Sequence, residues 1–213
     1  MTNTPTNVAL VQVLGAVAYG EWKAYEGAKA DADAATDEAT RRRHRKVAAE
    51  ELRHHKGFVA RLVALGADPE RAMKPFRVPL DRYHEHTSDD PVEAAVFGYL
   101  GEGIADDLLQ WLHKVVDPET AAFIDTVIAD EVAHEAAAAA DLRDALASEP
   151  DGRRRGARAA RHMVVHLLWS GRRGAAPLAA FIRLGRPHEL VGALLSGQAR
   201  RMSAAGLTPL GIR

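Results

Sequence analysis

The two halves of the sequence repeat one arrangement of side chains that can bind metal ions. In each half, a lone glutamate is followed about 30 residues later by a Glu-x-x-His pair. The six residues are Glu21, Glu51 and His54 in the first half, and Glu102, Glu131 and His134 in the second half. Side chains three residues apart lie on one face of a helix, so the glutamate and histidine of each pair can reach the same ion.

The types of these side chains indicate which ions would bind. Four carboxylates and two imidazoles in an apolar interior need counter-charges, because burying an unpaired charge is costly. Two divalent cations would balance the four carboxylates and leave coordination positions open for oxygen or water. Oxygen and nitrogen ligands favour iron or manganese over a thiolate type of zinc site. We therefore predict two iron ions, with manganese as the alternative, and O₂ as the co-substrate.

Four amphipathic helices are expected to position the six side chains. Apolar residues recur at spacings of three and four over residues 6–33, over a segment that ends at Gly66, behind a cap signal at residues 88–91, and from Asp117 onwards. The predicted ligands interrupt these apolar stripes. Because a helix rises about 1.5 Å per residue, the two helices of each half would bring their ligands to similar heights. The expected core bundle comprises residues 6–146.

The link between the second and third predicted helices is much longer than the other links. It spans about 25 residues, from Gly66 to Asp90, and contains three prolines. A link of this length lets the chain cross a bundle and start the second helix pair in the reversed sense. The sequence therefore predicts an all-α fold, a four-helix bundle in which a long crossover joins helices two and three.

The composition excludes several kinds of site. The chain has no cysteine, which excludes disulfides, thiolate metal sites and cysteine nucleophiles, and which fits a reducing, cytoplasmic location. The apolar residues 8–18 form a stretch too short to span a bilayer, and no basic segment precedes it, so no membrane association is expected. A length of 213 residues suits a single domain covering residues 1–213.

The C-terminal part of the chain is strongly basic. Residues 151–213 contain twelve arginines and two acids, a net charge of +10, whereas residues 1–150 carry −11. Two further helices, over residues 154–170 and 176–204, are expected in this extension. Its arginines could bind nucleic-acid phosphates or could form a solvated helix face, and the sequence leaves both interpretations open. The densest candidates for phosphate binding are residues 153–158 together with Arg161, Arg172 and Arg173.

The segments EELRHH (residues 50–55) and DEVAHE (residues 130–135) resemble the acid-Glu-x-x-His segments of ferritin-like di-iron carboxylate proteins. The resemblance covers residues 6–146. It implies a ferritin-like bundle in which all six residues bind iron and serve catalysis. Glu50 and Asp130 match the acid that supports a metal-bound histidine in those proteins, where such a partner fixes the orientation of the imidazole.

The additional helices and the segment SGQARRMSAAGL resemble the tRNA hydroxylase family that acts on 2-methylthio-N6-isopentenyladenosine. This narrower resemblance implies a di-iron monooxygenase that hydroxylates the isopentenyl group next to the tRNA anticodon. The chain has no cysteine for an iron–sulfur cluster and no Gly-rich nucleotide loop. An external electron donor, ferredoxin-like or reductase-like, is therefore expected as a partner, with tRNA as the second partner.

Two other classes of function use the same residues differently. A ferroxidase or iron-storage subunit would keep the six ligands and assemble into a 24-subunit shell, whereas a monomer or dimer is expected for an oxygenase. A metal-free RNA-binding helical protein would use the arginines and give the buried acids no role. Gel filtration separates the first alternative from the hydroxylase, and metal analysis separates the second.

Overall fold

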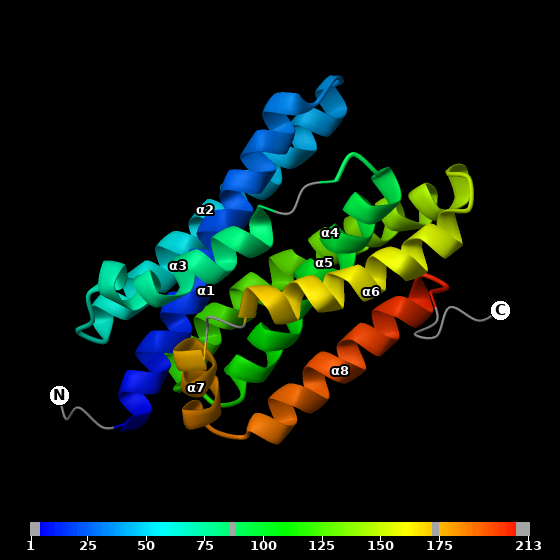
Figure 1. Ribbon diagram of the computed structural model, residues 1–213. Coiled ribbons are helices and arrows are strands. Elements are labelled where there is room, and N and C mark those ends of the chain that lie inside the picture. The colour runs from blue at the N-terminus through cyan, green and yellow to red at the C-terminus, as the bar shows by residue number, and fades with distance from the viewer. Residues whose placement is uncertain (1–4, 86–87, 172–174, 208–213) are drawn as a thin grey trace. The chain divides into compact units, whose positions relative to one another are not determined.

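The computed structural model describes residues 5–85, 88–171 and 175–207, and every regular element among them is a helix. This confirms the predicted all-α class for the described residues. The eight helices are α1 (Pro5–Ala34), α2 (Glu38–Ala64), α3 (Pro69–His84), α4 (Pro91–His113), α5 (Pro118–Ser148), α6 (Gly152–Gly171), α7 (Ala175–Leu184) and α8 (Pro187–Ala204). Figure 1 follows them along the chain.

The helices gather into two compact units. Unit 1 comprises Met1–Glu85 and Ser170–Gly185 and contains α1, α2, α3 and α7. Unit 2 comprises His86–Trp169 and Arg186–Arg213 and contains α4, α5, α8 and all but the last two residues of α6. Each unit therefore holds one of the two helix pairs that carry the repeated ligands. The single domain of residues 1–213 stays a prediction.

Four of the helices begin with the same capping arrangement. The side chains of Asp37, Asp68, Asp90 and Asp117 accept hydrogen bonds from backbone N–H groups in the first turns of α2, α3, α4 and α5. In the last three, a proline follows directly and provides a backbone angle that suits the first helical position. Each cap contributes about 1 kcal/mol by satisfying donors that have no partner within the helix. The predicted starts of α4 and α5 are thereby confirmed.

The core of unit 1 forms where α2 and α3 pack against α1. The residues of α2 that face this core are Ala48, Glu51, His54, Phe58 and Leu62. On α1, Gly15 allows the backbone of α3 to approach, because a Cβ atom there would lie only 2.4 Å from the carbonyl oxygen of Ala72. The apolar stripe predicted for the second helix, including its two interrupting polar residues, is confirmed.

Helix α3 corrects the prediction of a long link without a helix. Pro75 and Pro79 lie inside this helix, where each removes a backbone hydrogen bond to the preceding turn. Pro75 is exposed, and the buried stripe of Ala72, Met73 and Phe76 packs on α1. Pro69 lies in the first turn, where a proline suits the helix. Burial of the apolar stripe offsets the hydrogen bonds that the two prolines inside the helix remove.

Unit 2 has its own apolar core between α4, α5 and α6. Its buried members are Val92, Val96, Tyr99, Leu100, Leu142, Leu146, Ala159, Ala160, Met163 and Leu207. Helix α8 packs along α4. The prediction of one helix over residues 176–204 is wrong: Gly185 and Arg186 adopt positive φ angles of 122° and 51°, and Pro187 starts a new helix. Proline cannot continue the preceding helix, so the chain turns at this point.

None of the described helices combines enough length with enough apolar character to cross a bilayer.

Candidate metal centre

Unit 1 brings Glu21, Glu51 and His54 together, and we call these three residues the first half-site. Glu21 comes from α1, and the other two come from adjacent turns of α2. All three side chains are buried, and one ligand atom of each lies within 4.8 Å of a ligand atom of the other two. The predicted alignment of a lone glutamate with a Glu-x-x-His pair therefore occurs in this unit.

The distances within the first half-site suit a shared cation. His54 Nδ1 lies 3.4 Å from Glu21 Oε2 and 3.7 Å from Glu51 Oε2. These separations exceed an ordinary N–H···O hydrogen bond of about 2.9 Å. Two ligand atoms that each bind one ion at about 2.1 Å lie roughly 3 to 4 Å apart. The two carboxylates and the imidazole thus fit a divalent metal in both chemistry and spacing.

The electrostatics of the first half-site point in the same direction. Burial raises the pKa of Glu21 well above its usual range, and the nearby carboxylate of Glu51 raises it further, while contact with His54 lowers it. Two carboxylates in one buried place repel each other unless a proton or a cation lies between them. A divalent cation would relieve this repulsion and bind both groups in their charged form.

The structure distinguishes His54 from its neighbour His55, which the sequence alone could not fully separate from it. The Nδ1 atom of His55 lies 2.7 Å from the backbone oxygen of Ala18. A carbonyl can only accept, so His55 donates from Nδ1 to the backbone of α1. Its ring lines a hollow of about 290 Å³ together with Tyr19 and Trp22. His54 is therefore the metal-ligand candidate.

The acid that precedes each Glu-x-x-His pair was predicted to support a histidine. Glu50 lies 3.3 Å from Lys46 one turn earlier on α2, and its side chain is 13% exposed. This contact with Lys46 neither supports nor excludes a hydrogen bond from Glu50 to a histidine. The supporting roles of Glu50 and Asp130 stay predictions.

Unit 2 contains the second half-site, which we define as Glu102, Glu131 and His134. His134 Nδ1 lies 3.2 Å from Glu131 Oε2, so the Glu-x-x-His pair of α5 is formed. Both side chains are only partly buried, at 10% and 17% exposure. Glu102 is exposed, which differs from the buried position expected for it. The use of all six residues as ligands of one centre stays a prediction.

Most of the stripe predicted for α4 is buried, namely Val92, Tyr99, Asp106 and Leu109, but Glu102 is not. The buried face also contains Gly103 and Asp107, because α8 covers this side of α4. Arg201 of α8 donates to both carboxylate oxygens of Asp107, at 2.8 and 3.3 Å, and to Glu135 Oε1 at 2.8 Å. The sequence analysis missed these residues. A signal existed in the glycines of GEG and SGQARR, which mark places where helices approach closely.

Asp106 lies beside this group and has an unusual titration. Burial and, to a smaller extent, the charge of Glu131 raise the pKa of Asp106, while Arg201 lowers it. The resulting pKa is about 7. The Nη2 atom of Arg201 lies 3.7 Å from Asp106 Oδ2. Asp106 is thus buried next to the second half-site, and its carboxyl group titrates near neutrality.

The basic C-terminal helices divide into arginines with structural contacts and arginines on the surface. Arg155 binds Asp90 and Glu149 and so joins α6 to the start of α4 and the end of α5. Arg154, Arg158 and Arg161 are exposed on α6 at spacings of four and three, which places them in one row. Arg172 and Arg173 lie outside the described residues.

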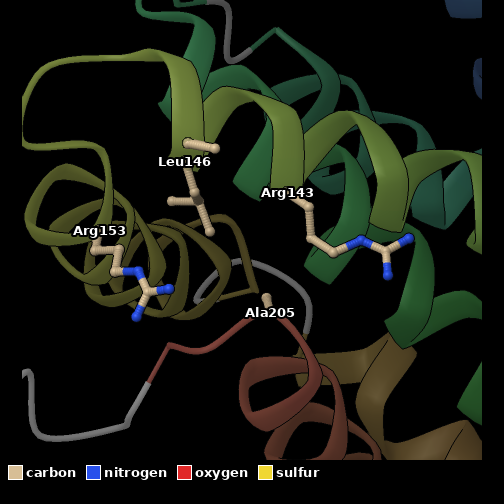
Figure 2. A pocket seen from close by; sticks show the side chains of 5 residues that line it. Arg143, Leu146, Arg153 and Ala205 are labelled. Carbon is tan, nitrogen blue, oxygen red and sulfur yellow. The ribbon is translucent and has the colours of Figure 1, made fainter.

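Unit 2 also contains a hollow of about 200 Å³ near the C-terminal end of α5. It is lined by Arg143, Leu146, Ala147, Arg153 and Ala205. Figure 2 shows Arg143 and Arg153 on either side of Leu146. None of the predicted metal ligands lines this hollow, so we do not assign it to the candidate site.

Comparisons with known proteins support the fold. A family model described as "Ferritin-like domain, actinomycetes" matches residues 5–184. A solved structure of a Synechococcus protein with aldehyde deformylating oxidase activity superposes with a TM-score of 0.80 at 19% sequence identity, covering 98% of this chain and 94% of the other. No match was found among curated proteins. The structural likeness confirms the predicted ferritin-like helical fold.

Proposed function

Because this chain belongs to the family of ferritin-like domains of actinomycetes, we propose that it is a di-iron oxidoreductase that uses O₂ to hydroxylate its substrate. The observation that carries the proposal is the first half-site. Two carboxylates and an imidazole meet there in a buried place, at distances that suit metal ligands. An interior without a cation would not favour this group, since each buried charge needs a partner.

The residues of both half-sites have defined tasks in this proposal. Glu21, Glu51 and His54 supply one set of ligands, and Glu102, Glu131 and His134 supply the corresponding set from unit 2. Iron ions bound by these residues would provide the electrons and the Lewis acidity with which O₂ is activated. The protein would balance the charge of the ions with four carboxylates and exclude water with apolar neighbours. Phe58 and Leu62, both fully buried one and two turns after His54, serve this second task in unit 1.

We further propose tRNA as the substrate and the isopentenyl group of a modified adenosine as the position hydroxylated. The row of Arg154, Arg158 and Arg161 supports an anionic substrate, because exposed arginines in a row can bind successive phosphates. An external ferredoxin-like or reductase-like donor would supply the electrons, since the chain contains no cysteine for a cluster of its own. The active form would be a monomer or a dimer.

Metal analysis of the purified protein tests the first part of the proposal. We expect two iron ions per chain, loss of bound iron in Glu51→Ala, and loss of O₂-dependent turnover with it. Val63→Ala is a matched control, because Val63 is 59% exposed on the same helix. A protein that stays iron-free and fully active would contradict the proposal. Gel filtration adds a second outcome, because a 24-subunit shell would favour a ferroxidase or storage protein.

Mass spectrometry of tRNA nucleosides tests the substrate. Cells that lack this protein should lose the hydroxylated isopentenyl nucleoside and accumulate the form without the hydroxyl group. Unchanged nucleosides would exclude this substrate and leave the di-iron centre in place. Aldehydes would then be the next substrates to assay, since the Synechococcus protein of similar fold has aldehyde deformylating oxidase activity.

Binding measurements test the basic row separately from turnover. Replacing Arg154, Arg158 and Arg161 together with Gln should weaken tRNA binding and reduce the slope of log affinity against log salt by roughly 2 to 3. Arg183→Gln is the matched control, because Arg183 is an exposed arginine of α7 outside the row. An unchanged salt slope in the triple variant would remove α6 from the tRNA surface.

A further inference from the structure

Arg201 is a buried arginine shared between three acidic residues of unit 2. Its side chain is 5% exposed, and it donates to Asp107 through Nη1 and Nη2 and to Glu135 through Nε. Asp106 lies 3.7 Å from its Nη2 atom. Burial lowers the pKa of Arg201, but its contacts with Asp107 and Glu135 outweigh that effect and raise it, so the guanidinium stays charged.

Two glycines make room for this group. A Cβ atom at Gly103 of α4 would lie 2.1 Å from Arg201 Nε, and a Cβ atom at Gly197 of α8 would lie 1.8 Å from Asp107 Oδ2. Both helices thus lack a side chain where the arginine and the aspartate cross the interface. The two glycines therefore let α4 and α8 approach closely enough for Arg201 and Asp107 to pair between them.

The acids that Arg201 engages lie beside the second half-site. Glu135 directly follows His134 and lies four residues after Glu131, so Glu131 and Glu135 share one face of α5. Asp106 lies four residues after Glu102 on α4. Any carboxylate within reach of a hard divalent cation can bind it, because aspartate and glutamate side chains offer the same oxygen ligands. A free carboxylate at residue 135 would therefore compete with Glu131 for the ion.

We propose that Arg201 is a positioning residue that selects which carboxylates of unit 2 bind the metal. By holding Glu135 and Asp107, it leaves Glu131 and His134 as the ligands. This inference rests on the proposed metal-binding function. It also gives α8 a task in the centre, although α8 lies beyond the residues 5–184 that match the family model.

Cobalt(II) binding to the full chain tests the proposal, because the visible spectrum of the ion reports its coordination. We expect Arg201→Met to weaken cobalt affinity roughly 10- to 100-fold, the range observed when partners of metal ligands are removed, and to alter the spectrum. Arg200→Met should leave both unchanged. Arg200 is the matched control because it also approaches Asp107, at 3.6 Å, but its side chain is 65% exposed.

A second substitution separates selection of ligands from simple support of the fold. Adding Glu135→Gln to Arg201→Met removes the competing carboxylate and should restore the affinity and the spectrum. A purely structural role of Arg201 predicts no recovery, and that result would overturn the inference. If Arg201→Met does not fold, Arg201→Met with Asp107→Asn removes both members of the buried charge pair and serves as the background for the same comparison.

Failure of this inference and failure of the proposed function give different results. Wild-type protein that binds cobalt, with an unchanged spectrum and affinity in the folded Arg201 variants, overturns the role of Arg201 alone. Wild-type protein that binds neither cobalt nor iron overturns the proposed function, and the role of Arg201 is then overturned with it.

Discussion

The two half-sites carry the same sequence motif in different surroundings. In unit 1, both glutamates approach the histidine in a buried place, and apolar residues surround the group. In unit 2, Glu131 contacts the histidine, Glu102 is exposed, and further acids lie close by together with Arg201. A repeated spacing of ligands therefore produced one compact group of three and one more open group.

The difference arises from the helix that covers each pair. In unit 1, α3 packs its apolar stripe on α1. In unit 2, α8 brings a buried arginine to α4, and the carboxylates of Asp107 and Glu135 turn towards it. We conclude that apolar packing mainly positions the first half-site, whereas ion pairs with Arg201 mainly position the second.

The largest effect is expected from removing a glutamate of each half-site in turn. Glu51→Ala should lower metal affinity by more than about 100-fold, since it removes a buried ligand itself, whereas removal of a ligand's supporting partner costs about 10- to 100-fold. Glu102→Ala should lower it only about tenfold, because Glu102 is exposed and other acids lie close to its half-site. Titration with manganese or cobalt measures both. Equal losses in the two variants would show that the half-sites do not differ as described.

A second contrast concerns the close contact of helices in each unit. Gly15→Ala should destabilise the fold by about 3 kcal/mol or more, because the new methyl group would meet the backbone of Ala72. Gly103→Ala should cost about 1 to 3 kcal/mol, because the side chain of Arg201 can move at the expense of its hydrogen bonds. Denaturant unfolding measures both free energies.

Two glycines in open positions provide the controls for this pair. Gly20 of α1 and Gly98 of α4 have no atom within 4 Å of a Cβ position. Alanine at either position should stabilise its helix by up to about 1 kcal/mol, the difference in helix propensity. Destabilisation of similar size in all four variants would indicate that close packing is not the cause.

A smaller effect, specific to unit 2, should depend on pH. The pKa of Asp106 is about 7 in the fold and about 3.9 in an unfolded chain. Between these values the folded protein binds more protons than the unfolded chain, so Asp106 lowers stability as pH rises from about 4 to 7. Asp106→Asn should therefore stabilise the metal-free protein by about 2 to 4 kcal/mol at pH 8 and by little at pH 4.

Thermal unfolding in the presence of a chelator measures this difference. Asp144→Asn is the control, since Asp144 is exposed on the same α5 helix. It should change the melting temperature by the same small amount at both pH values. A pH-independent gain in Asp106→Asn would mean that its carboxyl group is not protonated in the fold.

The sequence predicted what depends on periodicity within single helices. The four long helices, the caps at the starts of α4 and α5, and the first half-site all follow from spacings of three and four residues and from local start signals. Helix α3 was missed because three prolines outweighed its apolar stripe in that interpretation. The break at Gly185 was missed because an apolar stripe continues on both sides of it.

The contacts of Arg201 could not be predicted from the sequence, and the reason is physical. Arg201 and Asp107 are 94 residues apart, and no local pattern states which acid a given arginine will meet. Tertiary packing of α8 on α4 decides that pairing, and it also decides which side of α4 is buried. The predicted burial of Glu102 was wrong because an apolar stripe identifies a helix face only to within about one residue.

Helix α8 also bears on how this domain can be shortened. A chain ended at Leu184, where the family match stops, would lose Arg201 and leave the carboxylates of Asp107 and Glu135 without the guanidinium that binds both. Repulsion between these two carboxylates would then push α4 away from α5. A shortened domain therefore has to keep α8, which ends about twenty residues after the last residue of the family match, to retain this buried ion pair.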